Sequence, residues 1–172
     1  AVALSTIRRH GIAAFVLALA AGVKLWPVVL LPLVIVPLRM QPVRLLAALA
    51  AFALPAALIA VPMVASAFGS SSGLVAYASG WKTNSAIFPL IEALVSPAGS
   101  HVARWVSGLA LGTIVCVVAW RARNAEGEAT IRAAALVVGA LFLLSPAQLP
   151  WYATWVAVFL PFVPAPAFLW LA

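Results

Sequence analysis

Acidic residues are almost missing from this sequence. Among its 172 residues aspartate and glutamate together number three, and all three are glutamates. Only 8% of the residues are charged, whereas 66% are hydrophobic and the mean hydropathy is +1.18. Too little polar surface remains to cover a water-soluble core, and the chain is too hydrophobic for intrinsic disorder. The composition therefore predicts an integral membrane protein built of several helices.

Cysteine is equally scarce, and several catalytic motifs are absent. Cys116 is the one cysteine, so the chain can form no internal disulfide. The sequence has no P-loop, no glycine motif for nucleotides, no zinc-ligand spacing and no coherent Ser/His/Asp set. His10 and His101 are expected on opposite sides of the membrane, which disfavours a shared metal site. We therefore expect no metal and no cofactor.

Positive charge dominates the few charged residues. The chain has ten lysines and arginines and three acidic residues, which gives a net charge of +7 and an isoelectric point of about 11.3. In a soluble chain this balance would suggest nucleic acid. In a membrane chain, basic residues mark cytoplasmic loops and contact anionic lipid headgroups. We expect membrane lipids as partners and no nucleic acid.

The two ends of the sequence suggest a piece of a longer protein. The chain starts with Ala1 rather than methionine, and residues 168–172 stop inside an apolar run. We expect residues 1–172 to form a single transmembrane domain from the C-terminal part of a longer polypeptide.

Apolar tracts long enough for membrane helices recur along the chain. A spanning helix needs roughly 20 apolar residues. The expected tracts are residues 11–38, 45–67, 102–120, 133–144 and 153–172, and prolines interrupt several of them. Residues 87–95 are apolar but too short to span, which favours an interfacial or re-entrant helix. The predicted fold is all-α, a multi-pass helix bundle in the cell membrane with broken helices.

Short loops rich in arginine indicate which helix ends face the cytoplasm. Residues 121–132 form such a loop, so residues 68–101 are expected outside. If the tract 11–38 spans once, five basic residues lie inside and four outside, with Lys24 uncounted. If it forms a re-entrant hairpin that turns at residues 24–27, the counts are seven and two. We favour the hairpin, and a single kinked helix is the alternative. The seven are Arg8, Arg9, Arg39, Arg44, Arg121, Arg123 and Arg132.

Lys24 is the first candidate binding residue, because apolar residues flank it on both sides. A charge at membrane depth is costly, so it usually has a function or reaches toward the interface. One hypothesis is a cation that binds phosphate in a cavity. The other is a lysine at the hairpin tip that extends to the outer interface.

Two further groups of candidates are expected at the outer face. Trp81, Lys82 and Asn84 combine aromatic, basic and amide groups that can stack on a sugar ring and bind phosphate oxygens. Gln148, Trp151 and Tyr152 lie where Pro146 and Pro150 break a helix, and broken helices often line sites in membrane bundles. The alternative for both groups is an aromatic belt at the membrane interface.

Glu92 and a glycine pair have simpler interpretations. Glu92 is the one acid outside the cytoplasmic loop, and we expect an ion pair with Lys82 or Arg104 rather than a catalytic base. Gly108 and Gly112 form a GxxxG pattern that permits close helix packing, and we favour packing within the bundle over dimerisation.

Three segments resemble a family of membrane enzymes. Residues 20–27, AAGVKLWP, run on to Leu31 and Pro32; residues 77–88 read YASGWKTNSAIF; residues 144–155 read LSPAQLPWYATW. In this order, they resemble the GT-C superfamily of glycosyltransferases that use polyprenol-phosphate sugars. The likeness is nearest to the actinobacterial family 87 α-mannosyltransferases.

The resemblance implies transfer of a sugar, often mannose, from a polyprenyl-phosphate donor to a lipid or glycan acceptor on the outer face. In this superfamily the catalytic acid sits in the first external loop of the full protein. This chain has no aspartate, so the resemblance implies a C-terminal part without a catalytic residue of its own. Lys24, Lys82 or Arg104 would stabilise the phosphate leaving group. The alternative is half of a transporter or lipid flippase, whose broken helices and central lysine would also fit this pattern.

Overall fold

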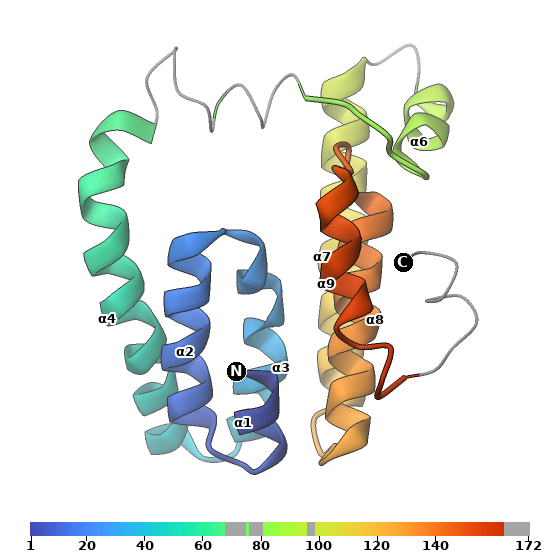
Figure 1. Cartoon of the computed structure of the whole chain (residues 1–172). Coiled ribbons are helices and arrows are strands. Elements are labelled where there is room, and N and C mark those ends of the chain that lie inside the picture. The colour runs from blue at the N-terminus through green and yellow to red at the C-terminus, as the bar shows by residue number, and fades with distance from the viewer. Residues whose placement is uncertain (68–74, 76–80, 96–98, 164–172) are drawn as a thin grey trace.

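In the computed structural model, residues 1–67, 75, 81–95 and 99–163 are described. This part of the chain is helical, without a β-strand, and 76% of the residues are in helices (Figure 1). The all-α prediction is therefore confirmed. One isolated parallel β-bridge joins two loops, and it belongs to the candidate site.

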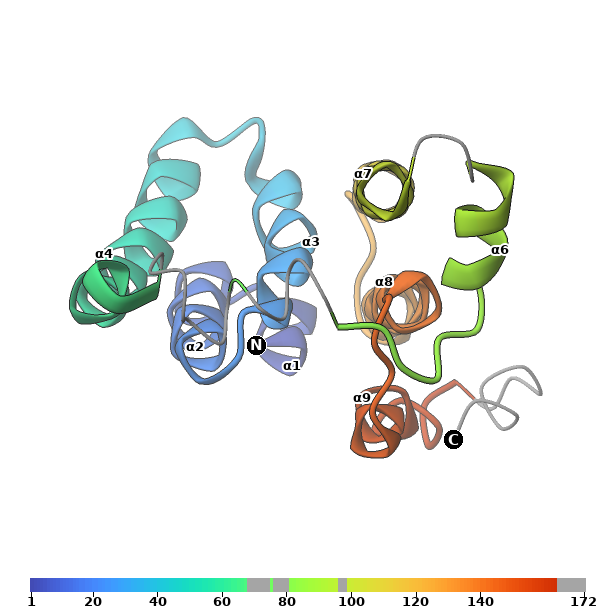
Figure 2. The ribbon, with the colours of Figure 1, turned by 90° about the horizontal axis from the view of Figure 1, so that it is seen from above.

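The first half of the chain forms a hairpin and one long helix. Short helix α1 (Val2–Thr6) leads into α2 (His10–Val23). The chain then reverses and returns through η1 (Trp26–Leu30), α3 (Leu31–Ile35) and η2 (Val36–Leu38). Long helix α4 (Pro42–Ala67) then runs beside α2 (Figures 1 and 2).

The reversal falls at the predicted turn. Lys24 has extended backbone angles, φ −148° and ψ 136°, which end α2. Pro27 is the second residue of η1, in the first turn, where the missing N–H of a proline has no helical partner to lose. The residues just before and after the hairpin lie at the same end of the molecule (Figure 1). How this hairpin sits in a membrane stays a prediction.

The hairpin and α4 approach each other closely at Gly22. A Cβ atom built on Gly22 would lie 2.7 Å from Cδ1 of Ile59. Only glycine therefore fits here without a shift of the isoleucine. Small residues serve the same purpose along α2, where Ala13, Ala14 and Ala18 are fully buried.

The described second half of the chain contains two long helices, α7 and α8, and shorter helices around them. Short helix α6 (Phe88–Leu94) precedes α7 (Ser100–Arg121), which descends beside the ascending α8 (Glu128–Leu144). Residues 145–149 then lead into η4 (Pro150–Tyr152) and α9 (Ala153–Ala157). Seen from above, α6 to α9 form a second group beside the hairpin and α4 (Figure 2).

The expected fifth span is not one continuous helix. α9 ends at Ala157, and successive turns follow as far as Phe162. Pro161 explains this end, because its ring would clash with the carbonyl of Ala157 in a regular helix. Residues 164–172, the rest of that predicted span, lie outside the described residues.

Within the described residues, two helices are long and apolar enough to cross a membrane. They cover Pro42–Pro62, with a mean hydropathy of 2.3, and Ser100–Arg121, with 1.8. Only 6% of an 18-residue apolar stretch of α4 is buried. This helix therefore turns large apolar side chains such as Leu54 and Leu58 outward. A soluble protein would bury these residues. Proline does not break this helix, since Pro55 and Pro62 lie inside it.

The glycine pair of α7 does not pack against the described part of the bundle. A Cβ atom at Gly108 or Gly112 would meet nothing within 4 Å. Our expectation of close packing within the bundle is therefore wrong for these residues. The side of α7 that contacts its neighbours instead buries Ala103, Ser107 and Val115.

Arginine-bearing ends of the helices gather at one end of the molecule. These are the α1–α2 connection, the start of α4 and the α7–α8 loop (Figure 1). Arg8 forms an ion pair with Glu126, and the guanidinium groups of Arg39 and Arg123 both lie over the ring of Trp120. The start of α7 lies at the opposite end, and the turn after α2 lies at about mid-height between the two ends.

Candidate functional site

Two of the three recognised segments are joined by backbone hydrogen bonds. The backbone N–H of Thr83 donates to the carbonyl of Pro146 over 3.2 Å. The backbone N–H of Gln148 donates to the carbonyl of Thr83 over 2.8 Å. These bonds form a parallel bridge between Thr83 and Ala147. Residues 81–85 and 145–149 are therefore held side by side.

The third segment meets the same region through Lys24. The Nζ atom of Lys24 lies 4.6 Å from the centre of the Tyr152 ring and 5.1 Å from that of Trp155. An ammonium group at this distance is attracted by the electron-rich face of an aromatic ring. Lys24 and Tyr152, both predicted as binding residues, thus lie together.

A stack of three aromatic rings supports Lys24. The rings of Trp26 and Trp155 stack with centres 4.7 Å apart, and those of Trp155 and Tyr152 stack at 4.0 Å. We call Trp26, Trp155 and Tyr152 the aromatic stack. Trp151 meets Tyr152 edge to face at 6.3 Å and is 58% exposed. The stack fixes the hairpin tip against the segment that follows α8.

Gln148 has a structural role at the end of α8. Its side chain is buried, and Nε2 donates to the carbonyls of Phe142 at 2.7 Å and Leu143 at 3.4 Å. The last carbonyls of a helix lack partners within the helix. The extended Ser145 before Pro146 ends α8 as predicted, and Gln148 folds back to satisfy the carbonyls left there.

Replacing Gln148 by leucine should destabilise the protein by about 1–3 kcal/mol, because the carbonyl of Phe142 loses its side-chain donor and keeps only the 3.4 Å bond from the backbone N–H of Ser145. Thermal unfolding in detergent measures this effect. The control is Gln41→Leu, since Gln41 is exposed at the other end of the molecule. A large loss of activity in Gln148→Leu without loss of stability would instead assign the amide to substrate binding.

Lys82 is paired with an acid, as the sequence predicted. Its Nζ forms an ion pair with Oε1 of Glu92 from α6. Arg104 of α7 lies next to this pair and donates from Nη2 to the carbonyl of Trp81 over 2.9 Å. Both cations face the ring of Phe88, whose centre is 6.0 Å from Lys82 Nζ and 5.6 Å from Arg104 Cζ.

Trp81 and Asn84 present exposed side chains in this loop. Trp81 is 51% exposed, and Asn84 is exposed with a φ of +49°. Asparagine tolerates this left-handed backbone better than most residues, which gives Asn84 a conformational role as well. Residues 77–80, the start of the recognised loop, lie outside the described residues.

Two buried polar atoms near this loop lack partners. They are Nε of Arg104 and Oγ of Ser107, one helical turn apart on α7. A buried donor without a partner is costly, and a water or ligand can satisfy it. Arg104, which the sequence suggested as an ion-pair partner of Glu92 or as a phosphate contact, therefore keeps donor capacity for a bound anion.

Carboxylates are too few to neutralise the cations of the site. The three glutamates of the chain all lie within the described residues. They pair with Arg8, Lys82 and Arg132. Lys24 and Arg104 thus have no side-chain carboxylate partner, and their charge is available to an anion. No cluster of three or more metal-binding side chains occurs among these described residues.

Our choice of binding residues left out two members of the aromatic stack. Trp155 lies three positions after Tyr152, a spacing that brings two side chains to one face of a helix. Trp26 lies two positions after Lys24 in an extended turn. The spacing of Trp155 could have been detected, whereas the contact with Trp26 depends on the fold of the hairpin.

Comparison with known proteins gives one match. Residues 93–170 match the model of the MptB C-terminal domain, a little under half of the chain. No curated protein and no solved structure matches the chain. The matched stretch includes residues 144–155, the segment that contacts both other parts of the site. The match supports the interpretation that this chain is the C-terminal region of a mannosyltransferase of the GT-C type, a class of membrane enzymes.

Proposed function

We propose that this chain is the C-terminal part of a membrane mannosyltransferase that takes its sugar from a polyprenyl phosphate. The acceptor is a lipid or glycan on the outer face of the cell membrane. The match to the MptB C-terminal domain supports the enzyme class and does not favour the transporter alternative.

One structural observation carries this proposal. Residues 145–155 contact the loop of Lys82 through the Thr83–Ala147 bridge and the hairpin tip through the aromatic stack. Residues 145–155 therefore link cations, aromatic faces and polar backbone from three segments that are distant in the sequence. The sugar of the donor requires aromatic and polar contacts, and its phosphate requires a cation.

The reaction breaks the bond between the anomeric carbon and a phosphate oxygen of the donor. A new bond forms between that carbon and the hydroxyl oxygen of the acceptor. Polyprenyl phosphate leaves with one more negative charge, which a cation such as Lys24 or Arg104 stabilises. The hydroxyl proton passes to a carboxylate in a part of the full-length protein outside this sequence. Trp81 and Trp151, which are 51% and 58% exposed, offer faces on which a sugar ring can stack.

The test is mannosyl transfer by the full-length protein in proteoliposomes. Two radiolabelled donors are compared, polyprenyl-phosphate mannose and a nucleotide mannose, each with a membrane extract as acceptor. We expect labelled acceptor from the polyprenyl donor alone, because the site offers aromatic and cationic groups but no nucleotide-binding motif.

Two results would overturn the proposal. Transfer from the nucleotide donor would assign a different donor class. Movement of the labelled polyprenyl donor across the bilayer, without transfer to acceptor, would support the flippase alternative. A control protein with both Lys24 and Arg104 replaced by methionine should show no transfer while inserting normally into the membrane.

A further inference from the structure

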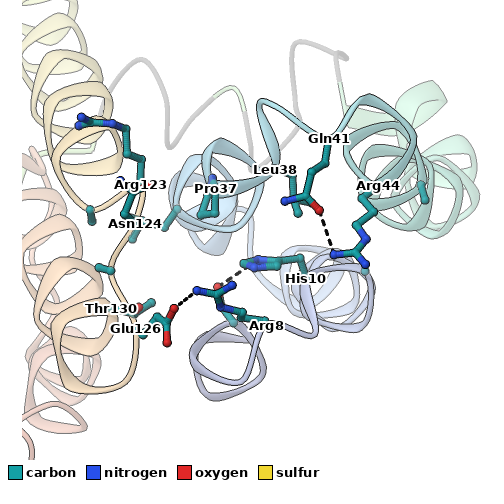
Figure 3. Close-up of a pocket in the computed structure, with 16 residues that line it drawn as sticks. Arg8, His10, Pro37, Leu38, Gln41, Arg44, Arg123, Asn124, Glu126 and Thr130 are labelled. Carbon is teal, nitrogen blue, oxygen red and sulfur yellow. Dashed lines mark hydrogen bonds and ion pairs between the residues drawn. The ribbon is translucent and has the colours of Figure 1, made fainter.

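A polar cavity lies at the arginine-bearing end of the molecule, away from the candidate site. It has a volume of about 550 Å³ and is formed where the α1–α2 connection, the start of α4 and the α7–α8 loop meet (Figure 3). We call it the basic-end pocket. Its polar lining side chains include Arg8, His10, Gln41, Arg44, Asn124 and Glu126.

The pocket has an excess of positive charge. Arg8 is neutralised by Glu126, but Arg44 bonds only to the neutral Oε1 of Gln41, at 2.9 Å. The remaining glutamates are held by Lys82 and Arg132. No side-chain carboxylate of this chain is left for Arg44. An arginine has five N–H donors, so most of those on Arg44 remain available to a ligand.

The other polar groups complement this charge. In Figure 3 the His10 ring lies between the guanidinium groups of Arg8 and Arg44. His10 Nδ1 is 3.5 Å from Ser5 Oγ. Burial lowers the pKa of His10, and although a backbone bond to Val34 raises it, the charge of Arg8 lowers it further. The ring is therefore neutral at pH 7, and the positive charge of the pocket comes from the arginines.

Arg123 also lines the pocket, but its charged group serves a different contact. Its Nη1 donates to the carbonyl of Trp120 at 2.8 Å, and its guanidinium lies 5.0 Å from the centre of that ring. Figure 3 shows this side chain turned away from Arg8 and Arg44. Arg44 is thus the main free cation of the described pocket.

The position of the pocket indicates where its ligand comes from. Arg44 belongs to the first turn of α4, and the apolar outer face of that helix begins with the exposed Val43 and Leu46. A charged residue at the start of a membrane helix lies at headgroup depth. Basic pockets between membrane helices at this depth are suited to the phosphates of anionic lipids.

We propose that the basic-end pocket binds the phosphate of an anionic phospholipid headgroup, with Arg44 as the main charged contact. Arg8, Gln41 and Asn124 supply further hydrogen-bonding groups around it. This site is separate from the proposed mannosyl-transfer site and does not depend on that function. The ligand chemistry is a phosphodiester, and the lipid is its source.

The experiment measures lipid binding to the full-length protein by native mass spectrometry in detergent. Phosphatidylglycerol and phosphatidylcholine with identical acyl chains are compared for wild type, Arg44→Gln and Arg132→Gln. Arg132 is a matched control, because it is exposed, basic and absent from the pocket lining. We expect tight binding of phosphatidylglycerol and about a tenfold rise in its Kd for Arg44→Gln alone.

Several outcomes would overturn the proposal. Equal weakening by Arg44→Gln and Arg132→Gln would show diffuse attraction by the basic end, and equal binding of phosphatidylcholine would exclude an anionic site. Displacement of the lipid by an equal concentration of inorganic phosphate would assign a free-phosphate site. Arg44→Lys, which keeps the charge, should retain binding within about threefold and shows that loss in Arg44→Gln is not misfolding.

Discussion

Replacing Lys24 by methionine in the full-length protein should lower kcat/KM for the polyprenyl-phosphate donor about thirtyfold. A charge-assisted contact to phosphate contributes roughly 2 kcal/mol, and Lys24 has no carboxylate partner that already uses its charge. Methionine keeps the length and apolar character of the side chain, so the change isolates the charge. Steady-state kinetics in proteoliposomes measure the effect.

Two controls make this result specific. Lys24→Arg keeps the cation over Tyr152 and Trp155 and should recover most of the efficiency. Lys82→Met should lower kcat/KM less than Lys24→Met does, because the Lys82 charge is already paired with Glu92. Wild-type efficiency in a correctly inserted Lys24→Met protein would show that Lys24 only extends to the membrane interface.

Local sequence signals predicted most of the helices and their ends. Pro27 explains the end of α2 before the turn at Lys24, since its ring would clash with the carbonyl of Val23 in a continued helix, and Pro146 restricts Ser145 at the end of α8. The short apolar run at residues 87–95 indeed forms α6. These features depend on neighbouring residues, which the sequence displays directly.

The same signals failed where the outcome depends on packing. Pro55, Pro62 and Pro161 all lie inside apolar tracts of the sequence. α4 nevertheless continues through Pro55 and Pro62, whereas α9 ends before Pro161. Tertiary contacts along α2 support α4, whereas α9 is five residues long before its turns begin. No local pattern distinguishes these prolines.

Long-range pairing limited the prediction of both sites. The sequence suggested that Lys82 and Gln148 share one side of the membrane, but the bridge between Thr83 and Ala147 comes from the fold. The role of Gln148 at the end of α8 was missed, because an amide near a broken helix serves a helix end and a ligand equally well. The basic-end pocket is lined by residues from three connections that are distant in the sequence. The number of basic residues in these connections could not predict that a cavity forms between them.

Removing the indole of Trp155 should destabilise the protein more than any other change in the site. Trp155→Ala deletes the middle ring of the aromatic stack and the second ring over which Lys24 lies. Each stacked pair contributes about 0.5–1.5 kcal/mol beyond burial, and the cation contact adds a similar amount. We therefore expect a loss of about 3 kcal/mol in the free energy of unfolding, measured by thermal or denaturant unfolding in detergent.

The matched control is Trp151→Ala, which removes the same side chain four positions earlier. Trp151 is mostly exposed and makes one edge contact with Tyr152, so its loss should cost less than about 1 kcal/mol. Trp155→Phe keeps a ring between Trp26 and Tyr152 and should recover about half of the lost stability. Equal destabilisation by Trp151→Ala and Trp155→Ala would mean that both residues act as interfacial anchors. The stack would then not be what holds the hairpin tip, with Lys24, against the segment after α8.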